Sequence, residues 1–328
     1  MGPVRKRLAL AAATALLLPL PSTAAPAPPP VKRVFVYVLE NASYADVLGN
    51  PKAPYLNALA KQYALATNYT ATGHESLGNY ISMTSGQPPN PATATDCLVY
   101  ATALCVQDVA NVADQLEAAH HTWRGYMDGM PRPCAHPAEN APDGNQGHYA
   151  TRHNPFVYYR SIVGDQKRCA SHVVALDQLW RDQKAGKVPE FAYVVPDLCH
   201  DGHDSGASCS AGGGLAEADA FARRTIPRIL ADRSFRDGGL LVLTFDEGAT
   251  VDDDAPLSVE SGEPDVGGRV FTVLVTPRLA KGSRLTAAYD HYSLLRTIED
   301  VFCLPYLGRA GDPLVTSMLP ALHQQRRC

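Results

Sequence analysis

The side chains of this 328-residue chain that could do chemistry fall into four short polar groups. The groups are Glu40 with Asn41, Ser76, Asp201 with His203, and Asp246 with Glu247. Carboxylate and amide oxygens are hard ligands, which suit Ca²⁺, Mg²⁺ or Mn²⁺. A serine hydroxyl is a weak nucleophile near neutral pH unless a metal or a base activates it. If the four groups lie close together, they therefore form a metal site beside a nucleophilic serine.

Ser76 belongs to the glycine-flanked stretch 72–86, which follows a strand-like run at 65–70. We expect the chain to turn through Gly73 and Gly78 and to enter a short helix from Asn79. Free backbone N–H groups at a helix start favour an anion, so the serine is placed to meet a phosphate group. The alternative is that Ser76 only caps the helix, and this stretch taken alone favours that alternative.

Three further residues leave the kind of metal open. Asp201, His203 and His291 add oxygen and nitrogen atoms that could hold Zn²⁺ or an iron-type ion, or could hydrogen-bond a phosphate. A metal beside Ser76 would lower the pKa of its hydroxyl and neutralise phosphate charge. Without a metal, the carboxylates around one serine would repel an anionic substrate.

The segments that must position these residues alternate between strand-like and helix-like patterns. Expected strands are 34–39, 65–70, 122–127, 191–195, 240–245 and 270–275, and expected helices are 53–63, 111–120, 177–184, 215–231 (interrupted near Pro227) and 291–302. Alternation predicts an α/β fold with a mostly parallel central sheet between helix layers. Ligands of such sheets bind beyond the carboxyl ends of the strands, which is where the polar groups fall. Their convergence is what favours a functional site over isolated helix caps.

The amino-terminal region reads as a secretory signal over residues 1–25. A charged stretch precedes the apolar run 8–20, and Thr23-Ala24-Ala25 is a plausible cleavage site. The run is too short to span a bilayer comfortably, so we expect no stable membrane insertion. A proline-rich leader at 26–33 and a single domain with loop insertions at 34–328 follow. The mature protein is expected to be exported, either periplasmic or secreted.

Charge and cysteine content narrow the class further. Removing the signal takes three positive charges and no negative ones, so the formal charge moves from −4 to −7, which disfavours nucleic-acid binding. Eight cysteines in an exported chain suggest four disulfides, although the sequence does not fix their connectivity and some could stay free. Pairing of nearest neighbours gives Cys97–Cys105, Cys134–Cys169, Cys199–Cys209 and Cys303–Cys328.

Six motifs in order resemble the bacterial phosphoesterase family of acid phosphatases and phosphatidylcholine-type phospholipases C. They are Glu40-Asn41, the stretch 74–80, Ala150 to Phe156, Val195-Pro196-Asp197 with the stretch 201–204, Thr244 to Gly248, and Asp290 to Asp300. The chain is especially similar to secreted acid phosphatases of the phosphatidylinositol-phosphatase kind. The resemblance covers nearly all of residues 34–307 and implies an alkaline-phosphatase-like fold.

The resemblance also implies residue roles. Ser76 matches the nucleophile that becomes phosphorylated, and Asn79 matches a group beside the transferring phosphoryl. The matched metal ligands are Glu40, Asn41, Ser76, Asp246 and Glu247, with Asp201 and His291 as further candidates; the matched phosphate-site histidines are His74, His153 and His203. The family form has proline where Glu75 and Gly78 stand here, which bears on substrate preference more than on reaction class.

The leading hypothesis is an exported, metal-dependent phosphomonoesterase of the acid phosphatase type, acting through a phosphoserine intermediate. Its substrate would be a small phosphate monoester or a phosphoinositide, and its cofactor a divalent ion: Ca²⁺, Mg²⁺, Mn²⁺ or Zn²⁺. We expect the three histidines to be protonated at acid pH and to surround the phosphate. One alternative is a phospholipase C-type phosphodiesterase, which would gain from an apolar lip that the sequence does not show. The other is a non-catalytic, Ca²⁺-dependent binding protein.

Overall fold

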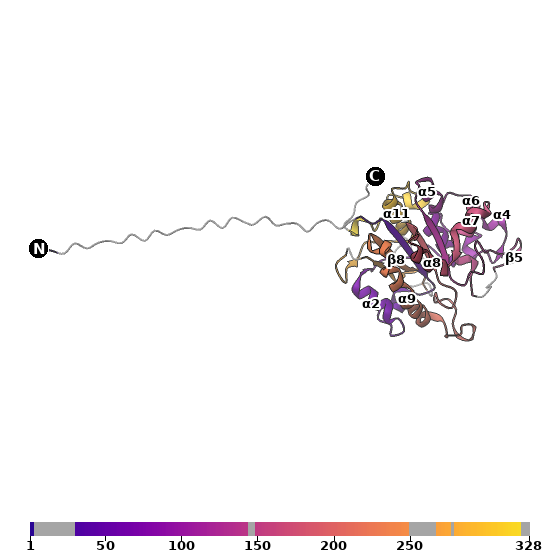
Figure 1. Ribbon diagram of the computed structural model, residues 1–328. Helices are drawn as coiled ribbons and strands as arrows, with labels where there is room; N and C mark the ends of the chain where they lie inside the picture. The colour runs from indigo at the N-terminus through magenta and orange to yellow at the C-terminus, as the bar shows by residue number, and fades with distance from the viewer. Residues whose placement is uncertain (3–29, 144–147, 249–266, 277–278, 323–328) are drawn as a thin grey trace.

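A computed structural model describes residues 1–2, 30–143, 148–248, 267–276 and 279–322 (Figure 1). Most of the predicted signal, residues 26–29 of the leader, all of the stretch 249–265 with its run of aspartates, and Cys328 lie outside the described residues. The leader was predicted to reach residue 33, but Arg33 already begins the first strand and Val31 is buried.

An eight-stranded sheet forms the centre of the molecule. Its order is β10 (Arg284–Leu285), β2 (Ala64–Ala66), β9 (Thr272–Val275), β8 (Gly239–Phe245), β1 (Arg33–Leu39), β7 (Phe191–Val195), β4 (Trp123–Met127) and β6 (Val173–Ala175). Only the pairings of β9 with β2 and β8 are antiparallel, so the predicted mostly parallel α/β sheet is confirmed. The continuous apolar runs of β1, β7 and β8 are buried on both faces, as parallel strands require.

Helices cover both faces of this sheet. They are α1 (Tyr44–Val47), α2 (Pro54–Gln62), α3 (Ser76–Ser85), α4 (Thr102–Cys105), α5 (Val112–Ala118), α6 (Arg160–Val163), α7 (Gln166–His172), α8 (Asp177–Ala185), α9 (Gly214–Ala231), α10 (Arg233–Arg236) and α11 (His291–Phe302). Side chains alternate along a strand, and Tyr37 of β1 hydrogen-bonds Thr225 of α9. Tyr193 of β7 instead packs against Tyr80 of α3. Helices α2 and α9 therefore cover one face, and α3 with α11 covers the other (Figure 1).

Several element boundaries differ from the sequence-based expectations. Helix α3 begins at Ser76, three residues before the predicted start, and Gly78 lies in its first turn instead of making a turn of its own. A Cβ at Gly78 would lie 2.9 Å from Cγ of Pro89, so close helix packing explains this glycine. Helix α9 continues through Pro227 without the predicted interruption. The second predicted strand shortens to Ala64–Ala66, and β6 was not predicted.

Three of the four predicted disulfides are present. Cys97–Cys105, Cys134–Cys169 and Cys199–Cys209 have Cα separations of 5.8, 5.4 and 5.4 Å, within the usual range. The fourth predicted pair includes Cys328, outside the described residues. Among the helices of the described segments, none combines the length and apolar character needed to cross a membrane.

Candidate active site

Two adjacent strands, β1 and β8, bring the acidic groups at Glu40 and Asp246 together. Leu39 and Phe245 are partners in the β1–β8 register, so Glu40 and Asp246 leave the sheet side by side. The Asn41 backbone N–H donates to Asp246 Oδ1 over 3.2 Å, and the Glu247 N–H donates to the same oxygen over 2.7 Å. Asn41 thus contacts Asp246 through its backbone, and it lines a cavity of about 260 Å³ next to Glu40.

The serine hydroxyl points at this acidic group. Ser76 is the first residue of α3, is almost fully buried, and donates from Oγ to Glu40 Oε2 over 3.1 Å. One turn later, the Tyr80 hydroxyl donates to Glu40 Oε1 over 2.5 Å. The N-cap position of α3 belongs to Glu75, whose side chain makes no cap hydrogen bond, and the Ser76 hydroxyl donates to Glu40. The structure therefore does not show the alternative in which Ser76 only caps its helix.

Two side chains near the start of α3 contact Glu247: Asn79 lies within the helix, and His74 lies in the turn before it. Asn79 donates from Nδ2 to Glu247 Oε2 over 3.0 Å, and its Oδ1 accepts from the backbone and side chain of Thr72. His74 Nδ1 lies 3.1 Å from Glu247 Oε1. That hydrogen bond raises the pKa of His74, although partial burial opposes it. His74 is therefore the member of this turn best suited to carry a proton.

His153 and Asp201 also lie close to Glu40. His153 Nδ1 lies 3.2 Å from Asp201 Oδ2, and its Nε2 lies 3.5 Å from Glu40 Oε2. The imidazole stacks on the Tyr80 ring, with centroids 5.5 Å apart. Burial, followed by the nearby charges of Arg152 and His203, lowers the pKa of His153 well below its usual range. The expectation of a protonated His153 at acid pH was wrong because complete burial penalises the cation.

His203 is turned toward an arginine that the sequence analysis missed. The Arg152 guanidinium donates from Nη2 to His203 Nε2 over 3.1 Å, so His203 Nδ1 carries the hydrogen donated to Asp204 over 2.8 Å. Arg152 also pairs with Asp143 at 3.0 Å and with Asp96 at 3.4 Å.

Asp96 and Tyr80 were also missed. Asp96 Oδ1 accepts from the Leu77 backbone N–H over 2.9 Å, so it binds the first turn of the helix that carries the serine. Arg152 stands beside His153 within one of the six motifs, and that adjacency was a usable signal. Asp96 lies in no motif, and only the folded chain brings it to the site.

His291 contacts the backbone of Asp246. It is fully buried, and its Nε2–H donates to the backbone oxygen of Asp246 over 2.6 Å. The Tyr69 hydroxyl donates to Nδ1 over 3.1 Å. Burial lowers the pKa of His291 to about 4. Because protein groups engage both ring nitrogens, His291 positions Asp246 in this structure.

The described residues fit a divalent cation. Glu40, Asp201 and Asp246 are fully buried, and burial raises the pKa of each carboxyl well above its usual range. Three ionised carboxylates so enclosed need a positive partner. Asp246 Oδ2 and His153 Nε2 are buried without a hydrogen-bond partner. Ligand atoms of Glu40, His153 and Asp201 all lie within 4.8 Å of one another.

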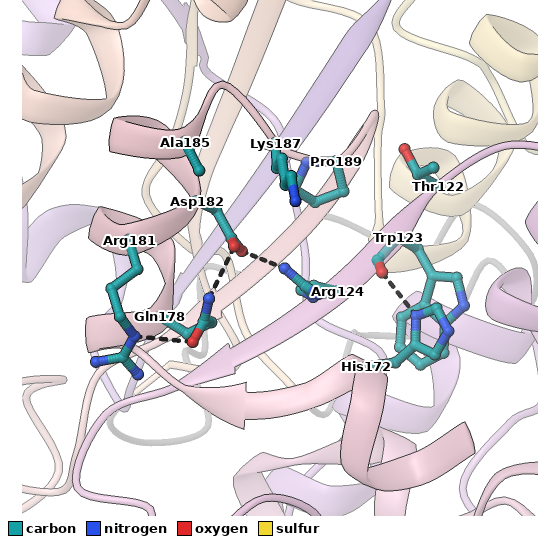
Figure 2. Close-up of a pocket in the computed structure, with 10 residues that line it drawn as sticks. All are labelled: Thr122, Trp123, Arg124, His172, Gln178, Arg181, Asp182, Ala185, Lys187 and Pro189. Carbon is teal, nitrogen blue, oxygen red and sulfur yellow. Dashed lines mark hydrogen bonds and ion pairs between the residues drawn. The ribbon is translucent and has the colours of Figure 1, made fainter. Parts of the chain in front are cut away.

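A larger cavity elsewhere takes no part in this arrangement. It measures about 430 Å³ and surrounds the first residues of β4, whereas the site lies beyond the carboxyl ends of the strands (Figure 2). Several of its polar groups bond one another: Asp182 accepts from Arg124 and from Gln178, and Arg181 donates to Gln178. His172 stacks on Trp123 in the same wall.

Comparisons with known proteins find a matching family and several relatives. The phosphoesterase family matches residues 49–305. A probable acid phosphatase of Kluyveromyces lactis is 27% identical over 296 residues, which cover 88% of this chain and 62% of that protein. A phosphate-repressible acid phosphatase of Penicillium chrysogenum is 26% identical, and the match covers 77% of this chain and 55% of that protein. This chain thus spans only about half to three fifths of these fungal relatives.

A shorter relative and a solved structure complete the comparison. A phosphatidylinositol-3-phosphatase of Mycobacterium tuberculosis is 26% identical over 286 residues, which cover 87% of this chain and 82% of that protein. An alkaline phosphatase superfamily protein from Vibrio parahaemolyticus superposes with a TM-score of 0.57 at 13% identity. That superposition covers 84% of this chain and 67% of the other. At this identity the likeness shows the fold, which is alkaline-phosphatase-like.

Proposed function

The chain belongs to the phosphoesterase family, and from that premise we propose that it is an exported, metal-dependent phosphomonoesterase acting through a phosphoserine. The observation that carries the proposal is the Ser76 hydroxyl, which lies 3.1 Å from Glu40 at the edge of a buried carboxylate cluster. Such a cluster is costly unless a cation shares it. The predicted signal and the three disulfides support export.

The cation would be held by Glu40, Asn41, Asp246 and Glu247 together with the Ser76 oxygen, and Asp201 and His153 stand beside them. A divalent ion bound there lowers the pKa of the serine hydroxyl and neutralises charge on the phosphate. The mostly oxygen donor set is that of Ca²⁺, Mg²⁺ or Mn²⁺, and the unpartnered His153 nitrogen extends it toward Zn²⁺.

The side chains have separate tasks in the proposed reaction. Glu40 accepts the Ser76 hydrogen bond and orients Oγ, which attacks phosphorus while the bond to the leaving oxygen breaks. His74, whose pKa is raised, gives a proton to that oxygen. Glu40 takes the Ser76 proton during the attack of Oγ. Water then attacks the phosphoserine and gives a proton to His74, the bond between phosphorus and Oγ breaks, inorganic phosphate leaves, and Glu40 returns the proton to Oγ. Asn79, fixed on Glu247, lies beside the transferring group.

The substrate class is a phosphate monoester. The Mycobacterium tuberculosis relative is named for a phosphoinositide monoester, which supports phosphoinositides alongside small soluble esters.

The test is a substrate panel of small monoesters, phosphoinositides and phosphatidylcholine, with and without a chelator. We expect inorganic phosphate to be released faster than diacylglycerol, loss of activity with chelator, and recovery when metal is restored. Ser76→Ala should lose several orders of magnitude in turnover, because the covalent route disappears. Ser85→Ala is the matched control, since the Ser85 hydroxyl lies at the other end of the same helix, where it bonds the backbone of Ile81 and Gln87.

Each contrary outcome has a separate meaning. Near-normal activity of Ser76→Ala would overturn the phosphoserine mechanism. Faster release of diacylglycerol would select the phospholipase C alternative, and Ca²⁺-dependent substrate binding without turnover would select the binding protein.

A further inference from the structure

An apolar groove runs along the segment that carries Asp96. It measures about 480 Å³, within the usual size range of small-molecule sites. We call it the 91–105 groove, and it is lined by Pro91, Ala92, Thr95, Cys97, Leu98, Val99, Leu104 and Cys105. Thr95 supplies its only hydroxyl, and that hydroxyl bonds backbone oxygens of its own turn. The groove thus offers a ligand hydrocarbon contact and almost no hydrogen bonding.

Exposed apolar side chains are concentrated in the 91–105 groove. Six large apolar residues are exposed among the described residues, and three of them lie here. Leu98 is 61% exposed, Val99 55% and Leu104 71%. Single exposed apolar residues are normal, whereas clusters on a soluble protein mark binding surfaces.

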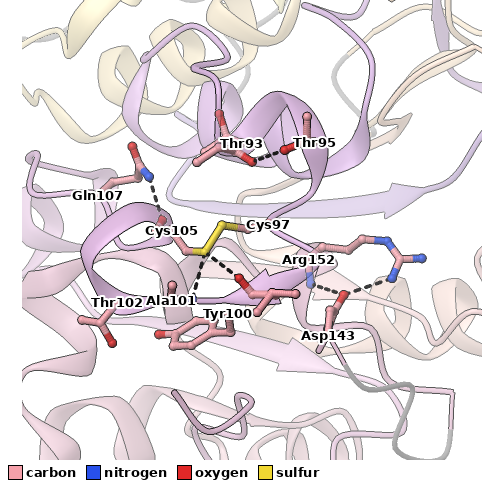
Figure 3. The surroundings of a disulfide bond; sticks show 12 residues. Thr93, Thr95, Cys97, Tyr100, Ala101, Thr102, Cys105, Gln107, Asp143 and Arg152 are labelled. Atoms are coloured by element: carbon pink, nitrogen blue, oxygen red, sulfur yellow. Dashed lines mark hydrogen bonds and ion pairs between the residues drawn. A yellow bond between two sulfur atoms is a disulfide. The ribbon is translucent and has the colours of Figure 1, made fainter. Parts of the chain in front are cut away.

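The covalent and backbone structure holds the groove open. The Cys97–Cys105 disulfide joins its two sides (Figure 3). Strand β3 (Val99–Tyr100) pairs with β5 (Ala141–Pro142), and the buried Tyr100 hydroxyl donates to the backbone oxygen of Val157. The apolar side chains are therefore presented on a fixed frame and lose little freedom when a ligand binds.

Two short connections join the groove to the candidate active site. Asp96 directly precedes Cys97, accepts the Leu77 N–H next to Ser76, and pairs with Arg152. On the other side, the Leu98 backbone oxygen accepts the N–H of Asp143, whose carboxylate also binds Arg152. Figure 3 shows Arg152 and Asp143 close to the disulfide. Asp96 and Asp143 therefore connect the groove segment directly to Leu77, next to Ser76, and to Arg152.

We infer that the 91–105 groove binds the hydrocarbon part of the phosphate ester whose phosphate reaches Ser76. This inference rests on the proposed function and narrows its substrates to amphiphilic monoesters. Because the groove is concave, it can take up one alkyl or aryl chain of a dissolved ester. A surface that binds a bilayer would instead be convex, with protruding apolar side chains. The phosphate end fixes orientation, and the apolar end adds binding energy in proportion to the area it buries.

The experiment measures kcat/KM for phosphate release from ethyl, butyl and hexyl phosphate, each kept monomeric. The alcohols of this series leave with nearly equal ease, so differences report binding of the chain. Full burial of one methylene corresponds to about a fourfold gain, and the groove is open on one side, so we expect about twofold per methylene. The double substitution Leu98→Ser with Leu104→Ser should flatten this dependence and leave ethyl phosphate unchanged.

Two further variants isolate the groove. Thr95→Trp should fill it and lower the rate with hexyl phosphate only. Leu314→Ser removes an equally exposed leucine outside the groove lining and should keep the full chain-length dependence. Because all the substituted side chains are exposed, folding should be retained, and circular dichroism checks this.

Every other outcome overturns the inference. A flat series in the wild type, or an unchanged slope in the double variant, removes the subsite. A loss confined to vesicles bearing a phosphomonoester would make the groove a membrane contact, and dissociation of a wild-type dimer by the double substitution would make it an interface between copies. The proposed function fails separately, if no ester releases phosphate or if Ser76→Ala still hydrolyses ethyl phosphate.

Discussion

At the residue scale, the site is organised by carboxylates that each hold two neighbours. Glu40 accepts from Ser76 and from Tyr80, and Glu247 accepts from Asn79 and contacts His74. The motif residues were predictable because their types and order carry the chemistry. Tyr80 was not singled out, since a tyrosine at an apolar helix position is usually a packing residue. Its role depends on a 2.5 Å contact that only the fold creates.

Asp96 gives a pH-dependent prediction. Burial raises the pKa of its carboxyl to about 6, although the Leu77 N–H and Arg152 oppose the shift. A raised folded-state pKa means that the favourable contribution is complete below about pH 4 and is lost as the pH rises through about 6. Asp96→Asn removes this loss. Relative to wild type, the variant should therefore gain about 2–3 kcal/mol of unfolding free energy between pH 4 and pH 7.5.

Urea unfolding of both proteins at the two pH values measures this difference. The other titrating groups are common to both proteins, so their contributions cancel. An equal stability difference at pH 4 and pH 7.5 would show that Asp96 ionises as readily in the folded protein as in the unfolded chain.

At the element scale, the long apolar strands and amphipathic helices were predictable, whereas boundaries set by tertiary packing were not. The start of α3 is the clearest case. Gly78 looks like a turn residue in the sequence, but it is needed because Pro89 presses on the first turn of the helix. Pro227 looks like a helix breaker, yet α9 continues through it. Short β6 carries too few residues to show a pattern.

Two glycines with positive φ, Gly86 at the carboxyl end of α3 and Gly49 after α1, give a matched pair of predictions. Gly86 has φ +69°, and a Cβ there would lie 2.3 Å from the backbone oxygen of Leu307. Gly49 has φ +81° with nothing within 4 Å of an added Cβ. Gly49→Ala should cost about 1–2 kcal/mol for the left-handed backbone alone. Gly86→Ala should cost clearly more, because backbone atoms must also move.

Thermal or urea unfolding distinguishes the two variants, and phosphatase activity should fall with Gly86→Ala because α3 carries Ser76. Equal costs at both positions would mean that the contact between Gly86 and the 307–309 segment yields easily.

The loop after β7 gives a third prediction. Cys199–Cys209 closes a loop of sequence separation 10 around Asp201 and His203, and His200 within it contacts both Asp128 and Asp197 at 2.9 Å. Replacing both cysteines by serine should cost about 2–3 kcal/mol of stability, because a loop of this length loses little chain entropy when closed. Activity at 25 °C should fall further than stability alone explains, as Asp201 orients His153.

The measurement compares kcat at a temperature where the variant is fully folded, together with its unfolding free energy. Cys134→Ser with Cys169→Ser is the control, since that disulfide ties α7 to Cys134 and includes no residue of the 199–209 loop that carries Asp201. If both pairs lower kcat equally, the 199–209 disulfide has no special role in positioning Asp201.

At the scale of the whole molecule, the sheet topology is what turns separate motifs into one site. Strands β1, β7 and β8 lie side by side and parallel, so residues from positions 40, 201 and 246 meet although they are far apart in the chain. The alternation of strands and helices predicted this meeting. It could not predict how deeply the carboxylates are buried, which depends on the helices and loops that close over the strand ends.

That burial makes stability depend on metal and pH together. Burial raises the pKa of Glu40, Asp201 and Asp246, so in metal-free protein ionisation of these groups opposes folding, and stability is lost as the pH rises above about 4. A divalent cation binds the ionised carboxylates and reverses this effect. At pH 7.5, metal at 100 times its Kd should raise the melting temperature by roughly 5–10 °C over chelated protein. At pH 4.5 protons compete for the same oxygens, so the rise should be smaller.

Melting curves with Mg²⁺, Ca²⁺, Mn²⁺ and Zn²⁺ against chelator measure the rise at both pH values, and Glu40→Gln should reduce the metal effect. No shift with any of the four ions at either pH would refute the metal site.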